Sequence, residues 1–283
     1  LTSGWNKGLM NADDYRAYVG GTSGLIYGYV NDGFYTVDDF ESFDAKSRTW
    51  KLKEGVVDSS PLSDTPRPGN AKFKKLTPVD PNSANPYQLT EADRTVIGNT
   101  TPKFSGGFGL NATYKGFDLS MFFNFMYDFD VFNANKVMLT TWADSHENNF
   151  GMEVASDRRW RNFDDMGNEI RYSPEILAEF NKNATMWNPT SIGKPICMSY
   201  AVEDGSFLRL NSATLGYTLP SVWTKKVGLS KVRFYVSGNN LFTLTGYSGY
   251  DPEVNIATGL TPNIDYNRYP RSRTYTFGAQ LTF

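Results

Sequence analysis

The chain has 283 residues, 20% of them charged, and a formal net charge of -2, so it lacks the basic excess that a general polyanion binder needs to neutralise phosphates. We therefore expect no nucleic-acid partner. The single cysteine, Cys197, and the single histidine, His146, exclude an internal disulfide framework, a thiolate-rich metal cluster and a multi-histidine zinc site.

Residues 1–103 combine short aromatic alternations with frequent turn signals. Leu25–Val30 is one such alternation, and Asn31-Asp32-Gly33 is the turn that follows it. The region is too long for an ordinary connection, so we expect a functional insertion with small sheets of its own. The first residues lack the basic and apolar regions of a signal peptide, and we expect the chain to be a piece of a longer protein.

From Phe104 onward, apolar and polar residues alternate with a period of two over long stretches. This pattern predicts strands at 104–115, 117–132, 206–219, 231–247 and 270–283. Lys115-Gly116 suits a two-residue hairpin turn between the first two strands. The alternation slips between Leu210 and Ala213, where we expect either a β-bulge or a different register.

Two long connections, 129–205 and 248–268, separate these strands. The first contains two helix-compatible stretches, Asn133–Trp142 and Ser173–Phe180. In the second of these stretches Ser173 suits the N-cap and Pro174 the first helical position. The connector Pro220–Ser230 is short, with room for one helical turn.

The predicted strands have the length and alternation of strands that cross a lipid bilayer. Such a strand needs about 9–11 residues with a lipid-compatible side chain at every second position, and its sheet must close because no backbone group can stay unpaired in hydrocarbon. The sequence contains no apolar run of about 18 residues, the length that would indicate a membrane-spanning helix. The alternative is a soluble β-sandwich, whose strands are usually shorter. Because the predicted strands are too few to close a barrel, we expect the missing strands to lie upstream.

The C-terminal strand ends on a pattern of small, polar and apolar residues, carried by Thr276, Gly278, Leu281 and Phe283. This pattern resembles the signal with which outer-membrane barrels present their last strand to the assembly machinery. An edge strand must find a partner before it can be buried, which gives the signal its physical logic. If Phe283 is periplasmic, the alternation of connections places 1–103, 129–205 and 248–268 outside the cell.

Four stretches of the C-terminal part resemble SusC/RagA-type TonB-dependent outer-membrane transporters. They read VIGNTTPKFSGGFGLNATYKGFDLSMFF, DGSFLRLNSATLGYTLP, VRFYVSGNNLFTLTGYSGYDPEV and YPRSRTYTFGAQLTF, and YRAYVGGTSGLIYGYVNDGFYTVDDF resembles the extracellular insertion of that family. The resemblance implies a barrel of about 22 strands with a plugged lumen. It also implies a SusD-like surface lipoprotein as a lid, and uptake of oligosaccharides or peptides driven by TonB.

The expected fold is therefore all-β: the C-terminal part of a large antiparallel transmembrane β-barrel with long extracellular loops that contain short helices. Residues 1–103 form an extracellular insertion region, and 104–283 form barrel strands and their loops. TonB would act through the missing N-terminal part. The expected function is that of a fragment of an outer-membrane importer, and the alternative is a soluble carbohydrate-binding β module.

Aromatic residues in the outer loops are the best candidates for ligand contact, because sugars stack on aromatic faces and peptides also use them. The candidates are Trp142, Trp160, Trp187, Tyr247, Tyr250, Tyr266 and Tyr269. The alternative is that these rings hold the loops together or touch the lipoprotein lid.

No residue pattern indicates catalysis, and we expect neither a metal nor a cofactor. His146 lies beside Ser145 and Asp144 on a loop, which does not supply the geometry of a catalytic triad. The carboxylates Asp251 and Glu253 are interpreted as solvated loop charges rather than as a glycosidase pair. Cys197 is interpreted as a packed small hydrophobe, and 79–89 lacks the carboxylates and the turn glycine of a calcium loop.

Overall fold

The computed structural model describes residues 14–16, 21–141, 151, 154, 158–192, 196–254, 262–266 and 269–283. The chain divides into two compact units. Unit 1 comprises Leu1–Thr100, Phe132–Val202 and Asn255–Tyr266, and unit 2 comprises Thr101–Val131, Glu203–Val254 and Asn267–Phe283. Within the described ranges, no helix has the length and apolar character needed to cross a membrane.

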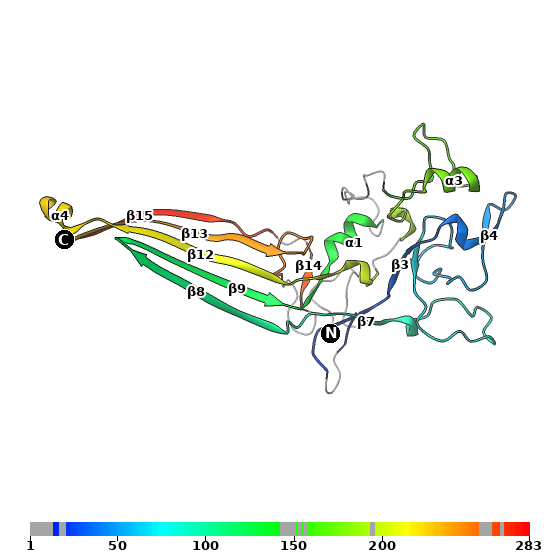
Figure 1. Cartoon of the computed structure of the whole chain (residues 1–283). Coiled ribbons are helices and arrows are strands. Elements are labelled where there is room, and N and C mark those ends of the chain that lie inside the picture. The colour runs from blue at the N-terminus through cyan, green and yellow to red at the C-terminus, as the bar shows by residue number, and fades with distance from the viewer. Residues whose placement is uncertain are drawn as a thin grey trace. The chain divides into compact units, whose positions relative to one another are not determined.

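Unit 2 is built on one antiparallel sheet with the strand order β15-β13-β12-β9-β8 (Figure 1). Its strands are β8 (Phe104–Tyr114), β9 (Phe117–Tyr127), β12 (Phe207–Thr218), β13 (Lys231–Thr245) and β15 (Thr274–Thr282). The expected all-β, antiparallel architecture is confirmed. β9 ends earlier than the predicted 117–132, because Asp128 adopts a positive φ of 58°, and closure into a barrel stays a prediction.

The short turns of the sheet follow from local sequence. Lys115 and Gly116 have φ values of 46° and 88°, as a two-residue hairpin turn with positive φ at both positions requires. The connector after β12 contains α4 (Ser221–Thr224) and the 3₁₀ helix η6 (Lys225–Val227). Both predictions are confirmed, and Figure 1 shows these turns at the same end of the sheet as the C-terminus.

A β-bulge in β12 keeps its apolar residues on one side of the sheet. The pairing of β12 with both β9 and β13 shifts between Leu210 and Ser212, so Asn211 is an extra residue. Directly paired residues share a face; Leu210 therefore lies beside Phe123, and Ala213 beside Met121, on the same face. The slip in the alternation is thus a β-bulge, which is one of the two possibilities expected from the sequence.

The register gives the sheet of unit 2 two unlike faces. We define the apolar face by Phe104, Phe108, Leu110, Tyr114, Phe117, Leu119, Met121, Phe123, Phe125, Tyr127, Leu208, Leu210, Leu215, Tyr217, Val232, Phe234, Val236, Phe242, Leu244, Tyr275, Phe277 and Leu281. The polar face is mostly Ser, Thr, Asn, Gln and Gly, and it carries the charges Asp118 and Arg233 near the end of the sheet that holds the 115–116 turn.

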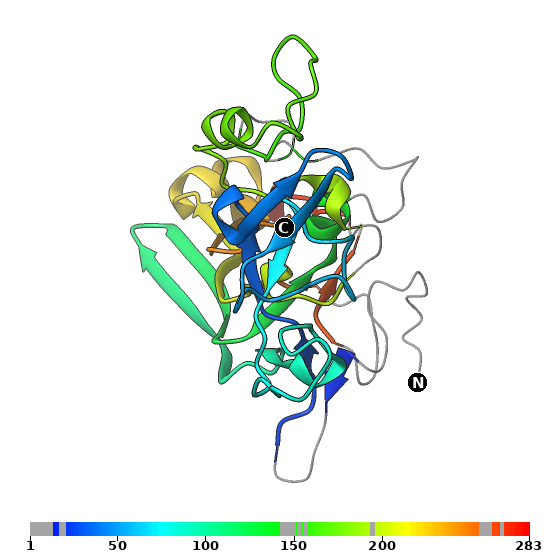
Figure 2. The same ribbon diagram turned by 90° about the vertical axis from the view of Figure 1, so that its right-hand side faces the viewer.

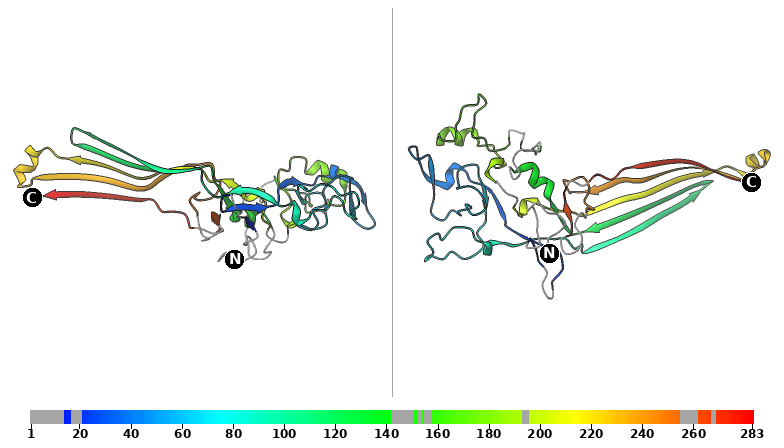
Figure 3. Two further views of the ribbon diagram at one scale, coloured as in Figure 1. Left: turned by 90° about the horizontal axis from the view of Figure 1, so that it is seen from below. Right: turned by 180° about the vertical axis from the view of Figure 1, so that it is seen from behind.

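The apolar face is uncovered over much of its area. Phe277 is 81% exposed, Phe104 64% and Leu244 60%. A contiguous exposed apolar surface of this kind marks contact with a membrane or with another protein. Figure 3 shows the sheet as a twisted ribbon whose strands run side by side along their length.

A ladder of side chains crosses the polar face from β9 to β15. The Arg233 guanidinium lies over Gly216 and forms a bidentate ion pair with Asp118, its Nε donating to Asp118 Oδ1 at 2.9 Å. The same guanidinium lies 5.2 Å from the centre of the Tyr235 ring. Tyr235 in turn covers Gly278, where a Cβ atom would collide with the ring. The two glycines therefore leave room for side chains that reach across a strand.

Substituting Gly216 by Ala should displace the guanidinium of Arg233 from Asp118. The arginine can move, so the expected cost is the loss of this solvent-accessible ion pair, a small decrease in the free energy of unfolding. Denaturant unfolding in detergent micelles measures this change in the free energy of unfolding. Gly109→Ala is the matched control, because a Cβ there would meet nothing closer than Met121 O at 3.6 Å. In an Arg233→Gln background the two alanine variants should be equally stable, and a persistent difference would contradict the account.

Unit 1 contains short sheets and helices. Its strands are β1 (Tyr15–Arg16), β2 (Leu25–Gly28), β3 (Asn31–Phe34), β4 (Phe40–Asp44), β5 (Thr49–Leu52), β6 (Ala71–Phe73), β7 (Thr95–Asn99) and β14 (Ile264–Asp265). They form the antiparallel sets β1-β2-β7, β3-β6 and β4-β5, while β10 (Asp130–Asn133) pairs in parallel with β14. The small sheets expected within 1–103 are confirmed.

Most of the helices that the structure describes in unit 1 lie in its middle segment. They are α1 (Ala134–Thr140), α3 (Pro174–Phe180), η4 (Pro189–Ser191) and η5 (Ser199–Ala201), the last followed by β11 (Val202–Asp204). The first segment contributes the 3₁₀ helices η2 (Val37–Asp39) and η3 (Glu91–Asp93). Pro174 opens α3 as predicted, but the Ser173 side chain makes no capping hydrogen bond. Figure 2 shows the blue strands of the first segment and, in green, α3.

One hydrophobic core joins all three segments of unit 1. Its fully buried members include Ile26, Phe73, Phe132, Val137 and Ile264. They come from β2, β6, β10, α1 and β14, so stretches that look like separate loops in the sequence pack as a single body. Because the core is shared, removing any one segment exposes apolar surface on the other two.

Asp93 closes the stretch 75–93 into a fixed loop. Its buried carboxylate accepts hydrogen bonds from Leu76 N (2.9 Å), Thr77 N (2.8 Å), Thr77 Oγ1 (2.7 Å) and Thr90 N (2.8 Å), and Lys75 Nζ lies 3.4 Å away. Burial by itself acts to raise the pKa of Asp93, but these hydrogen bonds outweigh it and hold the pKa well below its ordinary value.

Asp93→Asn should open this loop. The side-chain amide of asparagine would point its N–H group toward N–H and O–H donors, so some of the hydrogen bonds that close the loop would be lost. We expect a loss of about 2 kcal/mol or more in local stability, measured as faster hydrogen exchange at 77–89. The lowered pKa means that the wild-type loop is fully held above the ordinary carboxyl pKa and begins to loosen below about pH 4. Asp80→Asn in the same loop is the control, since Asp80 is exposed and accepts from Asn82 N alone. Equal exchange in the two variants would refute this role.

Candidate functional site

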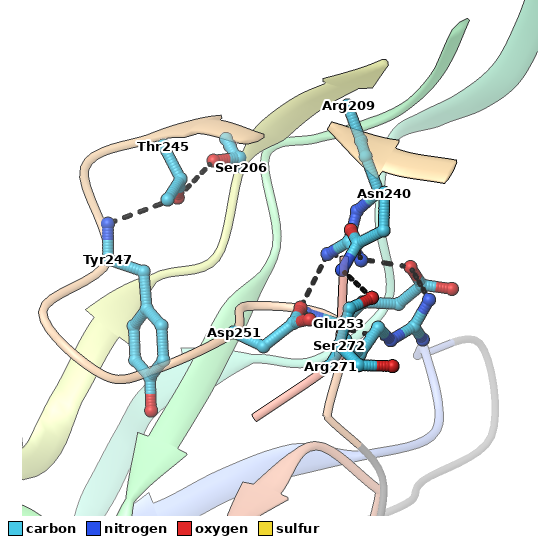
Figure 4. Close-up of polar contacts among 9 residues, drawn as sticks. All are labelled: Ser206, Arg209, Asn240, Thr245, Tyr247, Asp251, Glu253, Arg271 and Ser272. Carbon is cyan, nitrogen blue, oxygen red and sulfur yellow. Dashed lines mark hydrogen bonds and ion pairs between the residues drawn. The ribbon is translucent and has the colours of Figure 1, made fainter. Parts of the chain in front are cut away.

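A buried charge cluster lies at the ends of β12 and β13 in unit 2 (Figure 4). Arg209 is 1% exposed and its Nη2 lies 2.5 Å from Asp251 Oδ1 and 3.7 Å from Glu253 Oε2. Arg271 lies 3.4 Å from Asp251 Oδ2 and 3.1 Å from Glu253 Oε2. The interpretation of Asp251 as a solvated loop charge is therefore wrong, because two arginines compensate its burial.

Asn240 extends this cluster from β13. Its Oδ1 accepts from Arg209 Nη1 at 3.3 Å, and its Nδ2 donates to the backbone carbonyl of Ser272 at 3.2 Å. Asn240 has a positive φ of 54°, so the irregularity in β13 is what turns its side chain into the cluster. The cluster thus fixes the chain on both sides of the 255–261 stretch to the end of the sheet.

The chain just after β13 is held by a small apolar core. Tyr247 is 6% exposed and packs with Phe129, Val131, Phe207 and Val254. Its backbone N–H donates to Thr245 Oγ1 at 3.1 Å, and Thr245 Oγ1 donates to Ser206 O at 2.8 Å (Figure 4). The ring of Tyr247 therefore packs inside the protein, and ligand contact by Tyr247 stays a prediction.

The other aromatic candidates lie in different surroundings. Tyr250 is 80% exposed, and Tyr269 is also exposed, whereas Tyr266 packs against the core of unit 1. Trp187 is buried, donates from Nε1 to Thr140 O at 3.3 Å and meets Tyr200 edge-on. Trp142 lies outside the described residues, as does His146.

Trp160 combines burial with an unused donor. It is 3% exposed, packs with Ile170 and Leu177 and meets Phe34 edge-on at 5.7 Å. It also lines a cavity of about 470 Å³, and its Nε1 has no hydrogen-bond partner. Buried indole N–H groups are normally paired, so this one is an exception, and it lies against Gly69 in the packed interior.

The residues of the C-terminal pattern lie on β15, at one edge of the sheet. Leu281 and Phe283 are exposed, and Gly278 accommodates the ring of Tyr235. The glycine is thus required by the sheet itself, and the role of Thr276, Gly278, Leu281 and Phe283 in assembly stays a prediction.

Cys197 is buried in the core of unit 1, as interpreted from the sequence. Burial raises the pKa of its thiol well above the ordinary value, which makes thiolate chemistry unfavourable. Over the described ranges, no group of three or more His, Cys, Asp or Glu side chains could hold a metal ion.

Arg209→Ala should leave the buried Asp251 and the partly exposed Glu253 with Arg271 as their one arginine partner in the cluster. Breaking a buried pair of this kind costs roughly 3 kcal/mol or more, and we expect protease cleavage to begin between 246 and 254. Arg273→Ala is the control, because Arg273 is an exposed arginine beside β15. If both variants resist the protease equally, the cluster does not hold this segment.

No protein-family model matches the chain, but curated relatives do. TonB-dependent receptor P3 of Formosa agariphila is 33% identical, over 92% of this chain and 22% of the relative. TonB-dependent receptor P26 of the same organism is 29% identical, over 83% of this chain and 22% of the relative. TonB-dependent receptor SusC of Bacteroides thetaiotaomicron is 38% identical, over 30% of this chain and 8% of the relative.

Solved structures of the RagAB peptide transporter have the same fold. One matches with a TM-score of 0.64 and 22% identity, over 99% of this chain and 25% of the solved chain. The open-open state of the RagAB peptide importer matches with a TM-score of 0.58 and 23% identity, over 99% of this chain and 24% of the solved chain. The chain belongs to the SusC/RagA-type TonB-dependent receptors.

This SusC/RagA-type chain spans about a fifth of the length of the curated relatives that it matches along most of its own length. Its residue patterns identified the family, but they missed the Arg209 cluster. The two carboxylates Asp251 and Glu253 can be recognised as a pair in the sequence. Their spacing from Arg209 on β12 and from Arg271 before β15 gives no sign that these residues meet.

Proposed function

We propose that the chain is part of the wall and outer loops of a TonB-dependent outer-membrane importer of oligosaccharides or peptides. The observation that carries the proposal is the sheet of unit 2, with an apolar face left uncovered and a polar face bearing Asp118 and Arg233. A soluble carbohydrate-binding module would gain nothing from exposing Phe277 and Phe234, whereas a barrel wall requires it. The contribution to transport is selective passage by pore lining and loop contacts, without bond chemistry.

The orientation follows from the connections. We propose that the turn at 115–116, the α4 connector and the C-terminus are periplasmic, and that unit 1 is extracellular. Short turns on one side and long loops on the other are the general pattern of outer-membrane barrels. A SusD-like lipoprotein would then cover the loops of unit 1, and the TonB complex would act through a part of the protein outside this chain. The similarity to SusC and to the RagAB peptide transporter supports this choice of partner.

Neighbouring residues on β15 test the barrel wall. In the full-length receptor in its native membrane, Phe277→Cys carries a label on the apolar face and Thr276→Cys carries one on the polar face. A spin label at 277 should be reached by lipid-soluble oxygen and protected from a polar nickel relaxant, and the label at 276 should show the opposite preference. Labels that behave alike, or a receptor released from membranes without detergent, would defeat the proposal.

A further inference from the structure

Two cavities of unit 1 adjoin each other at Asn162 and Arg171, which line both. The smaller holds about 230 Å³ and the larger about 470 Å³. The smaller is lined by three arginines, Arg48, Arg67 and Arg171, and by no acidic residue among those that the structure describes there. Its chemistry is that of an anion site.

Arg48 is held in place and keeps its hydrogen-bonding capacity. It sits in the turn between β4 and β5, with its guanidinium 4.8 Å from the centre of the Tyr172 ring. Phe43 also stacks on Tyr172 at 6.1 Å, and the guanidinium of Arg171 lies 5.7 Å from the centre of the same ring. The nearby carboxylate of Asp44 is occupied by Lys46 N and Ser47 Oγ. An arginine stacked on an aromatic ring still presents its in-plane N–H groups, which fit an oxyanion in a bidentate manner.

Each of the other two arginines has a carboxylate neighbour, but these neighbours do not cancel the positive charge of the cavity. Arg67 lies 3.8 Å from Asp64, with both side chains substantially exposed, so this pair is weak. Arg171 lies 2.5 Å from Glu169 through Nε, which leaves its terminal nitrogens for a ligand. Neither carboxylate lines the cavity.

The larger cavity also offers more donors than acceptors. It is lined by Trp160, by the amide of Asn188 and by two arginines, of which Arg159 donates to Val154 O and Arg161 pairs with Asp165. Its one acidic lining residue, Asp164, has its carboxylate occupied by the backbone N–H groups of Met166 and Asn168 and by the Asn168 amide. A ligand that fits must therefore be rich in acceptors.

We propose that these cavities bind an acidic oligosaccharide, with a carboxylate or sulfate of one ring between Arg48, Arg67 and Arg171. The next ring then occupies the larger cavity, beside Trp160, Arg159 and Arg161. A peptide brings a backbone N–H for nearly every carbonyl, and these donors would meet mostly donors in the lining. Sugar hydroxyls can accept, and anionic substituents accept without donating. The inference rests on the proposed importer function and names its substrate class.

Calorimetric binding to the purified full-length receptor in detergent tests the site without requiring transport. The probes are tetragalacturonate and a sulfated galactan tetrasaccharide, with maltotetraose as the neutral probe and tetraglutamate as the peptide probe. We expect at least one acidic sugar to bind more tightly than the neutral one, and its affinity to fall as salt rises. Arg48→Gln should weaken that binding about tenfold, the effect of losing one charged hydrogen-bond donor.

Lys46→Gln is the matched control, because Lys46 lies in the same turn and does not line the cavity. It should leave the affinity unchanged. If Arg48→Gln lowers the melting temperature of the receptor, Arg67→Gln replaces it as the test variant. Arg48→Lys should restore only part of the affinity, because lysine keeps the charge without the planar fork.

Three results would overturn the proposal: failure of both acidic sugars to bind, equal weakening by Lys46→Gln, or tighter binding of tetraglutamate than of either sugar. The selectivity between the carboxylate and the sulfate probe identifies the anionic group. Energy-dependent uptake in cells is measured separately. If the cells take up another ligand but the receptor does not bind acidic sugars, this inference is wrong and the importer proposal stands. If the receptor binds acidic sugars but the cells take up no ligand, the binding site stands and the importer proposal is wrong.

Discussion

The pairing of side chains across the sheet of unit 2 is the constraint on which the rest of the chain depends. Every residue is committed to one of two faces by its hydrogen-bonded neighbours, so a single unmatched residue reverses the faces beyond it. The bulge at Asn211 prevents that reversal: without it, Leu208 and Leu210 would lie opposite to Leu215 and Tyr217. The irregularity in the strand is therefore what preserves a continuous apolar face, and that face is what a bilayer can solvate.

Charged side chains on the polar face and at the strand ends have limited access to solvent, so each needs a partner of opposite charge. Asp118 and Arg233 neutralise each other across Gly216, and Arg209 neutralises Asp251 at the end where the long loops leave the sheet. In each case the partner comes from a different strand or loop, so the charges also fix the register and the loop. The sheet is thus specified by its polar contacts as well as by its apolar pattern.

Unit 1 shows how long connections can pack into one body that contains cavities. Its core draws on Phe73, Phe132 and Ile264 from three separated stretches, and Asp93 closes one of its loops. A second, smaller apolar cluster holds Trp50 and Trp160 beside the two cavities, and Arg48 stacks on Tyr172. A rigid scaffold below variable loop residues lets one architecture serve different ligands.

The sequence by itself determined the strands, their two faces, the turn at 115–116 and the family. Each of these rests on local alternation, on positive φ at glycine or on contiguous motifs, and such signals lie within a few residues of one another. The packing of three loops into one body, the burial of Asp251 and the meeting of Arg48, Arg67 and Arg171 were decided by tertiary structure. Contacts between residues far apart in the chain leave no periodic trace, because any of the chain's many arginines could have compensated the same carboxylate.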